Sequence, residues 1–115
     1  MVKISGIKNC DTMKKALRWL DAQHIPYEFI DYKKSAVSDT WIANMLAQHG
    51  LDTIVNKRGT TFRKLDEQTK AELNEENAVA LLCEHTSMIK RPILEKDGAS
   101  VVGFSAEKYE AFFNE

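Results

Sequence analysis

The sequence predicts an α/β protein in which helices flank a mixed four-stranded sheet, with an all-helical insertion between the second and third strands. Three observations lead to this fold class. A strand, a helix and a second strand follow one another near the start of the chain, and helical patterns alone fill its middle. Near the end, an Asp-Gly turn joins two further strands. A strand-helix-strand unit has parallel strands and a hairpin has antiparallel strands, so the sheet is mixed.

The strand-helix-strand unit spans residues 2–32. An apolar strand is predicted at 2–7, and residues 27–32 alternate apolar with polar side chains as a second strand does. Residues 13–22 are predicted to be helical, because apolar residues recur there at i, i+3, i+4 and i+7. Pro26 separates this helix from the second strand. The apolar face of the helix consists of Met13, Ala16, Leu17 and Leu20.

The helical insertion is predicted between about residues 38 and 85. Ser38 is a suitable N-cap for its first helix, and Gly50 is a suitable residue to end that helix. Shorter helices are expected at 66–73 and 77–84. The first helix carries an apolar stripe that is typical of a core face, formed by Trp41, Ile42, Met45 and Leu46.

The last part of the chain returns to strands. Residues 88–95 pass into a strand, residues 96–98 form the turn, and residues 100–104 form the partner strand. Pro92 stands at the head of the first strand, where an edge position or a special turn, including a cis peptide, accommodates it. Ser105 caps a final helix. The residues of this helix that face the core are Tyr109, Phe112 and Phe113.

Size and composition favour one globular domain over residues 1–115. The 43% hydrophobic and 29% charged residues are ordinary for a globular protein, and the formal net charge of -1 gives no reason to expect nucleic acid or a membrane as a partner. No signal peptide or spanning segment is apparent, so we expect a cytoplasmic protein with both cysteines free. The three histidines show no metal-ligand spacing with either cysteine, so no metal site is expected.

Cys10 is the candidate nucleophile, because it lies between the first strand and the first helix. The unpaired N–H groups and the positive dipole end of a helix stabilise a thiolate over a thiol. Asp11 and Thr12 are suitable capping residues just after the sulfur, although the charge of Asp11 tends to raise the thiol pKa. The alternative is that Cys10 is an inert small hydrophobic residue.

Two further features have both a chemical and a structural interpretation. Residues 56–64 form a polar, basic loop without periodicity, in which Arg58 and Arg63 offer planar groups suited to an oxyanion or a carboxylate. The alternative is a solvated loop with ordinary surface cations. Cys83 lies near the end of an apolar helix, where a packing role is favoured over a second redox role.

Several segments of the chain resemble the arsenate reductase/Spx (ArsC-like) family, and most closely its YffB-like branch. The resemblance covers essentially the whole chain and implies a thioredoxin-like (glutaredoxin-like) fold with a helical insertion. The segments that carry it are GIKNCDTMKKA at 6–16, NKRGTTFRKL at 56–65, IKRPIL at 89–94 and VGF at 102–104.

The resemblance also implies roles for individual residues. In the glutathione- and glutaredoxin-coupled arsenate reductases of this family, one cysteine attacks the oxyanion, and Cys10 matches it. Arg58 and Arg91 match the arginines that help to hold the anion, and Pro92 matches a cis-proline beside the active thiol. The chain carries Phe104 where those enzymes have a third arginine. Its cysteine loop reads NCDT at 9–12 and lacks their Cys-Gly-Thr/Ser run.

The leading hypothesis is a glutathione-dependent thiol-disulfide reductase in which Cys10 forms a mixed disulfide. Lys8 is expected to lower the Cys10 pKa, Asn9 and Thr12 to hydrogen-bond near the sulfur, and Pro92 to shape the glutathione cleft. Glutathione is the expected co-substrate, its carboxylates suiting Arg58 and Arg91, and glutaredoxin is a candidate redox partner. No bound cofactor is expected, and the protein is expected to be a monomer.

Two other hypotheses stay open. One is an arsenate reductase in the strict sense, with the Arg63 side chain replacing the missing arginine. The other is a non-catalytic, Spx-like regulator that binds RNA polymerase or another protein. The Cys-x-x-Cys switch of those regulators is absent, because Met13 stands three residues after Cys10. The retention of Arg58 and Arg91 together with the thiol favours an enzyme over a docking protein.

Overall fold

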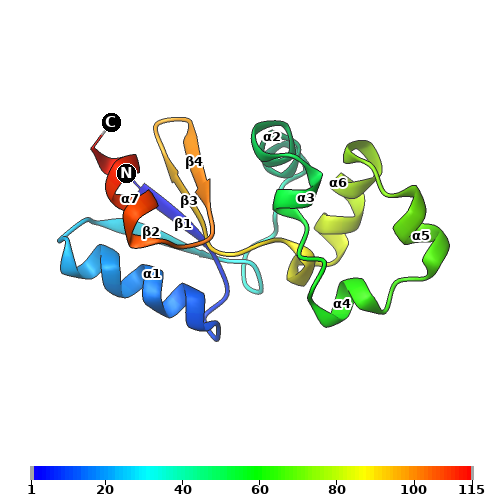
Figure 1. The fold of residues 1–115 in the computed structure, drawn as a ribbon, viewed down its shortest axis with the longest axis horizontal. Helices are drawn as coiled ribbons and strands as arrows, with labels where there is room; N and C mark the ends of the chain where they lie inside the picture. The colour runs from blue at the N-terminus through cyan, green and yellow to red at the C-terminus, as the bar shows by residue number, and fades with distance from the viewer. Residues whose placement is uncertain (1, 115) are drawn as a thin grey trace. The chain divides into compact units, whose positions relative to one another are not determined.

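The computed structural model describes residues 2–114, and their backbone contacts divide the chain into two compact units (Figure 1). The sheet unit comprises residues 2–35 and 91–114, and the helical unit comprises residues 36–90. The two units correspond to the predicted sheet and the predicted helical insertion. Within residues 2–114, no helix combines the length and the apolar character needed to cross a bilayer.

The sheet unit contains the predicted mixed four-stranded sheet, in the order β2-β1-β3-β4. Parallel pairing of β1 with β2 places Val2 beside Tyr27, and antiparallel pairing of β1 with β3 places Ile4 beside Leu94. The hairpin of β3 and β4 turns at Asp97 and Gly98, whose φ angles of 51° and 83° are those that an Asp-Gly hairpin turn requires. The elements are β1 (Val2–Gly6), α1 (Asp11–Ala22), β2 (Tyr27–Asp31), β3 (Ile93–Lys96), β4 (Ala99–Val102) and α7 (Ala106–Phe113).

Helices α1 and α7 contribute to one apolar core with the sheet. Tyr109 of α7 is fully buried, and its hydroxyl donates a hydrogen bond of 2.8 Å to the carbonyl of Gly103. Its ring meets those of Trp19 and Phe104 edge to face, at centroid distances of 5.6 and 4.9 Å. This packing fixes the first helix, and therefore its N-terminus, against the strands. The buried members of the core are Val2, Ile4, Met13, Ala16, Leu20, Leu94, Tyr109 and Phe112.

The helical unit is organised by α2 and α6, which lie against each other. Ser38 caps α2 as predicted, accepting a hydrogen bond of 3.0 Å from the N–H of Trp41, and Gly50 ends this helix with a φ of 88°. Asn74 and Asn77 cap α6 through reciprocal side-chain bonds. The elements are α2 (Asp39–His49), α3 (Leu51–Ile54), α4 (Thr60–Arg63), α5 (Glu67–Glu72), α6 (Glu75–Glu84) and the short 3₁₀ helix η1 (Thr86–Met88).

Three local predictions were wrong. Part of the expected loop at 56–64 is α4, a single helical turn that is too short to show a periodicity. Helix α6 begins two residues before the predicted start, because its capping box lies at Asn74. The hairpin strands are also shorter than predicted. β3 begins only at Ile93, because the Lys90 N–H bonds to the Ile54 carbonyl and not to a neighbouring strand of the sheet. β4 ends at Val102, because Gly103 has a positive φ.

The core makes a prediction about stability. Leu20→Ala is expected to lower the free energy of unfolding by about 3 kcal/mol, because it leaves a cavity at a fully buried position. Urea unfolding followed by circular dichroism measures the change. Leu17→Ala, on the same helix but only partly buried, is the matched control and is expected to cost clearly less. Equal losses in the two variants would contradict the described core.

Candidate active site around Cys10

Cys10 occupies the N-cap position of α1, with extended backbone angles of φ -141° and ψ 126°. Its carbonyl accepts the first helical hydrogen bond, of 3.0 Å, from the N–H of Lys14. The prediction that Asp11 or Thr12 caps the helix was therefore wrong, because both already lie within it. Cys10 is partly exposed and packs against the apolar core. Its sulfur thus lies at the helix end where N–H groups lack helical partners.

The surroundings of Cys10 favour the thiolate. Partial burial raises the pKa of Cys10, and this effect is opposed by the backbone N–H of Met13, the side chain of Arg91 and the backbone N–H of Thr12, which favour the charged sulfur. The positive charge of Arg91 lowers the pKa further, and the pKa of Cys10 ends below its ordinary value. This is the environment that makes a cysteine a nucleophile.

Arg91 reaches the sulfur because of the strand register. Antiparallel pairing places Ile93 of β3 opposite Ser5 of β1, so Arg91 lies near the end of β1, from which the Cys10 loop starts. The peptide bond between Arg91 and Pro92 is cis, as the resemblance implied, and the Pro92 carbonyl accepts a bond of 2.8 Å from the N–H of Gly103. Three residues of the predicted site, Cys10, Arg91 and Pro92, therefore belong to one compact unit.

Other members of the predicted site lie around this group or on the helical unit. Lys8 and Asn9 are exposed in the loop before Cys10, and the cation that lowers the Cys10 pKa is Arg91. Thr12 contributes its backbone N–H. Arg58 and Arg63 are exposed residues of the helical unit; the N–H of Arg58 donates to the Asn56 side chain at 3.3 Å, and Arg63 ends α4. Their roles toward Cys10 stay predictions.

The strongest contribution that the sequence did not reveal is the backbone N–H of Met13. Sequence patterns locate the helix but not its first hydrogen bond, and that bond decides which N–H groups point at the sulfur. The signal was nonetheless present, since a helix that begins at Asp11 turns the N–H groups of Thr12 and Met13 toward residue 10.

Cys83 has the opposite environment. Its thiol donates a hydrogen bond of 2.8 Å to a carboxylate oxygen of Asp39 and lies 3.7 Å from the Val37 carbonyl. Burial, the hydrogen bond to Asp39 and the negative charge of Asp39 raise the pKa of Cys83 to about 11. Cys83 therefore stays a thiol at neutral pH, which supports its interpretation as a packing residue.

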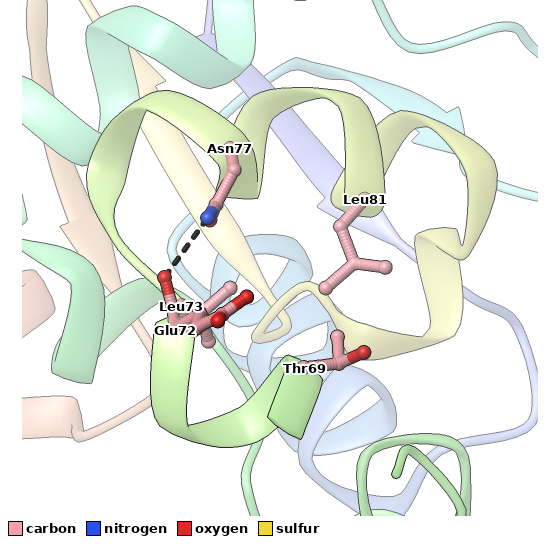
Figure 2. Close-up of a pocket in the computed structure, with 5 residues that line it drawn as sticks. All are labelled: Thr69, Glu72, Leu73, Asn77 and Leu81. Atoms are coloured by element: carbon pink, nitrogen blue, oxygen red, sulfur yellow. Dashed lines mark hydrogen bonds between the residues drawn. The ribbon is translucent and has the colours of Figure 1, made fainter. Parts of the chain in front are cut away.

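A metal-binding cluster and a pocket are the other features that could form a site. Among residues 2–114, no group of three or more His, Cys, Asp or Glu side chains is placed to hold a metal ion. A hollow of about 170 Å³ lies within the helical unit, where Asn77 donates a bond of 2.9 Å to the Glu72 carbonyl (Figure 2). Its lining contains no cysteine, histidine or cation, so it offers neither a nucleophile nor an anion site. The lining residues are Thr69, Glu72, Leu73, Asn77 and Leu81.

Comparison with known proteins identifies the family of the chain. Residues 5–112 match the model of the ArsC family. The chain belongs to the ArsC family. A solved YffB protein is 47% identical, with a TM-score of 0.93 over 96% of this chain and 97% of its own. An arsenate reductase (ArsC) related protein from Brucella melitensis is 44% identical, with a TM-score of 0.77 over 99% and 95%. The chain thus shares the fold of these solved relatives, a mixed four-stranded sheet with flanking helices.

Curated ArsC relatives include proteins of different kinds. An uncharacterized protein of Haemophilus influenzae is 42% identical over 98% of this chain and 99% of its own. The global transcriptional regulator Spx of Streptococcus pyogenes is 24% identical over 99% of this chain and 86% of its own. The family therefore contains both reductase-like proteins and regulators, and the choice between them depends on the site.

Arg91 is expected to be the residue on which Cys10 reactivity depends most. Arg91→Met removes the charge and the side-chain hydrogen bond at the sulfur, so the thiolate fraction of Cys10 near pH 6 is expected to fall about tenfold. The pH dependence of iodoacetamide alkylation, read by mass spectrometry in a Cys83→Ser background, measures it. Lys8→Met is the control at an exposed cation of the same loop. An unchanged profile in Arg91→Met would remove Arg91 from the site.

Proposed function

We propose that this ArsC-family protein is a glutathione-dependent thiol-disulfide reductase with Cys10 as its nucleophile. The observation that carries the proposal is the group of donors around one sulfur: two helical N–H groups and the Arg91 guanidinium, which together lower the Cys10 pKa. A lowered pKa at a partly exposed thiol favours nucleophilic attack at neutral pH. Docking alone does not require such an arrangement.

The proposed reaction proceeds in two exchange steps. The Cys10 thiolate attacks the glutathione sulfur of a mixed disulfide, so that the substrate leaves as a thiolate and takes up a proton, while Cys10 becomes bonded to glutathione. A second glutathione thiolate then attacks the glutathione sulfur of this adduct. Glutathione disulfide leaves and the Cys10 thiolate returns. The two steps together convert the mixed disulfide and one glutathione thiol into the substrate thiol and glutathione disulfide, so the incoming glutathione is oxidised and the substrate sulfur is reduced.

Several expectations belong to the same proposal. Because no Cys-x-x-Cys pair is present, the adduct must be resolved by an external thiol, for which glutathione or glutaredoxin is the candidate. Arg91 and Arg58 are each proposed to bind glutathione carboxylates, and Pro92 is proposed to shape the cleft beside Cys10. No resident cofactor is required, and a monomer in a reducing cytoplasm suffices.

Arsenate reduction is the second candidate, favoured by the name of the solved Brucella melitensis relative. The same thiolate is suited to attack an oxyanion. The chain has Phe104 where the arsenate enzymes have their third arginine, which weakens anion binding by about 2 kcal/mol for each lost charge-assisted contact.

Turnover distinguishes these functions. With glutathione, glutathione reductase and NADPH, the protein is expected to reduce the mixed disulfide of glutathione and 2-mercaptoethanol. Cys10→Ser is expected to lower the rate to background, a loss of at least about a hundredfold, because the nucleophile is gone. Cys83→Ser is the matched control and is expected to retain the rate.

Other outcomes would favour the alternatives. NADPH consumption that depends on arsenate and glutaredoxin, without reduction of the mixed disulfide, would replace the proposal by arsenate reduction. No turnover of either substrate, together with a partner protein that still binds Cys10→Ser, would favour a regulator of the Spx kind.

A further inference from the structure

Tyr32 is a buried tyrosine at the edge of the Cys10 site, with no role in the reaction proposed above. It follows β2 directly and is only 4% exposed. Its backbone N–H donates a hydrogen bond of 2.8 Å to the carbonyl of Gly6, the last residue of β1. Tyr32 is therefore fixed beside the strand end from which the Cys10 loop starts.

The alternation of side chains separates Tyr32 from the core that supports α1. Phe29 of β2 packs against that core. Residues 30 and 32 both follow on the opposite face of the sheet, so Tyr32 points away from that core. Leu94 of β3 is also a core residue, so its neighbour Glu95 shares the face of Tyr32. The phenol and the Glu95 carboxylate thus occupy the same face of the sheet. Since Asp31 pairs with Gly6 and Ile93 with Ser5, Tyr32 is level with Arg91, whereas Glu95 lies further along β3, opposite Lys3.

The charges of Arg91 and Glu95 both act on the phenol of Tyr32. Burial raises the pKa of Tyr32 far above its ordinary range, the positive charge of Arg91 opposes this, and the negative charge of Glu95 adds to it. The hydroxyl therefore stays neutral and lies within electrostatic reach of the guanidinium that serves Cys10. A neutral phenol oxygen accepts a hydrogen bond without cancelling the charge of its donor.

We propose that Tyr32 is a positioning residue that keeps the Arg91 guanidinium directed at the Cys10 sulfur, against the competing attraction of Glu95. The inference rests on the proposed function of Cys10 and extends it by a second layer of residues. An arginine side chain has many rotamers, and ordering it costs free energy. A rigid, buried neighbour lowers that cost and, unlike a carboxylate, leaves the full positive charge available to the thiolate.

Tyr32→Phe tests the inference, because it removes the hydroxyl and keeps the ring. In a Cys83→Ser background, the thiolate fraction of Cys10 near pH 6, measured from the pH dependence of iodoacetamide alkylation, is expected to fall about threefold. Tyr109→Phe is the matched control: it also removes one buried hydroxyl, in this case bonded to Gly103, and Arg91 has no part in the pKa of Tyr109. It is expected to leave the Cys10 profile unchanged.

A double-mutant cycle separates positioning from a general structural effect. In an Arg91→Met background, Tyr32→Phe is expected to have no further effect on the Cys10 profile. Glu95→Gln, at a half-buried residue where the fold tolerates an isosteric change, is expected to increase the thiolate fraction. This second variant keeps the inference testable if Tyr32→Phe does not fold.

Three results would overturn the inference. Tyr32→Phe could fold and show the same Cys10 profile as Tyr109→Phe, or Tyr32→Phe could still change the profile in the Arg91→Met background. The third result is a lower thiolate fraction in Glu95→Gln. These results differ from a failure of the proposed function. If the proposed function fails, Cys10 of the parent protein has an ordinary pKa, and none of the variants can raise a pKa that was not lowered.

Discussion

The site depends on the interaction between the Cys10 sulfur and the donors that surround it. The N–H groups of Thr12 and Met13 come from the start of α1, and the guanidinium of Arg91 comes from the segment before β3. Both sources act against the burial of the sulfur, which raises its pKa and is outweighed by them together. The sheet matters to the chemistry for this reason: the pairing of β1 with β3 brings a residue distant in sequence to the thiol.

The contrast between the two cysteines shows that environment, and not residue type, decides reactivity. Cys10 meets hydrogen-bond donors and a positive charge, whereas Cys83 meets a carboxylate oxygen of Asp39 at 2.8 Å. The first environment stabilises the thiolate and the second stabilises the thiol. A chain with one such reactive thiol and no neighbouring Cys-x-x-Cys partner depends on an external thiol to complete a reduction cycle, which is why glutathione is central to the proposal.

The sequence predicted those features that are set locally. The mixed sheet, the Ser38 and Ser105 caps, the Asp-Gly turn and the position of Cys10 before α1 follow from periodicity and turn chemistry within a few residues. The single turn of α4 was missed because four residues carry too little pattern. The choice of Arg91, not Lys8, as the cation at the sulfur is set by strand register. The resemblance to known proteins had implied only that Arg91 helps to hold the anion.

The central claim is that the surroundings of Cys10 lower its pKa below that of a free thiol, and the ultraviolet absorbance of the thiolate measures this most directly. The pH titration of the native protein, minus that of Cys10→Ser, isolates the one sulfur. We expect a midpoint below the free-thiol value of about 8.5. A midpoint at or above that value would show that the donors around Cys10 do not outweigh its burial, and the assignment of Cys10 as the nucleophile would be withdrawn.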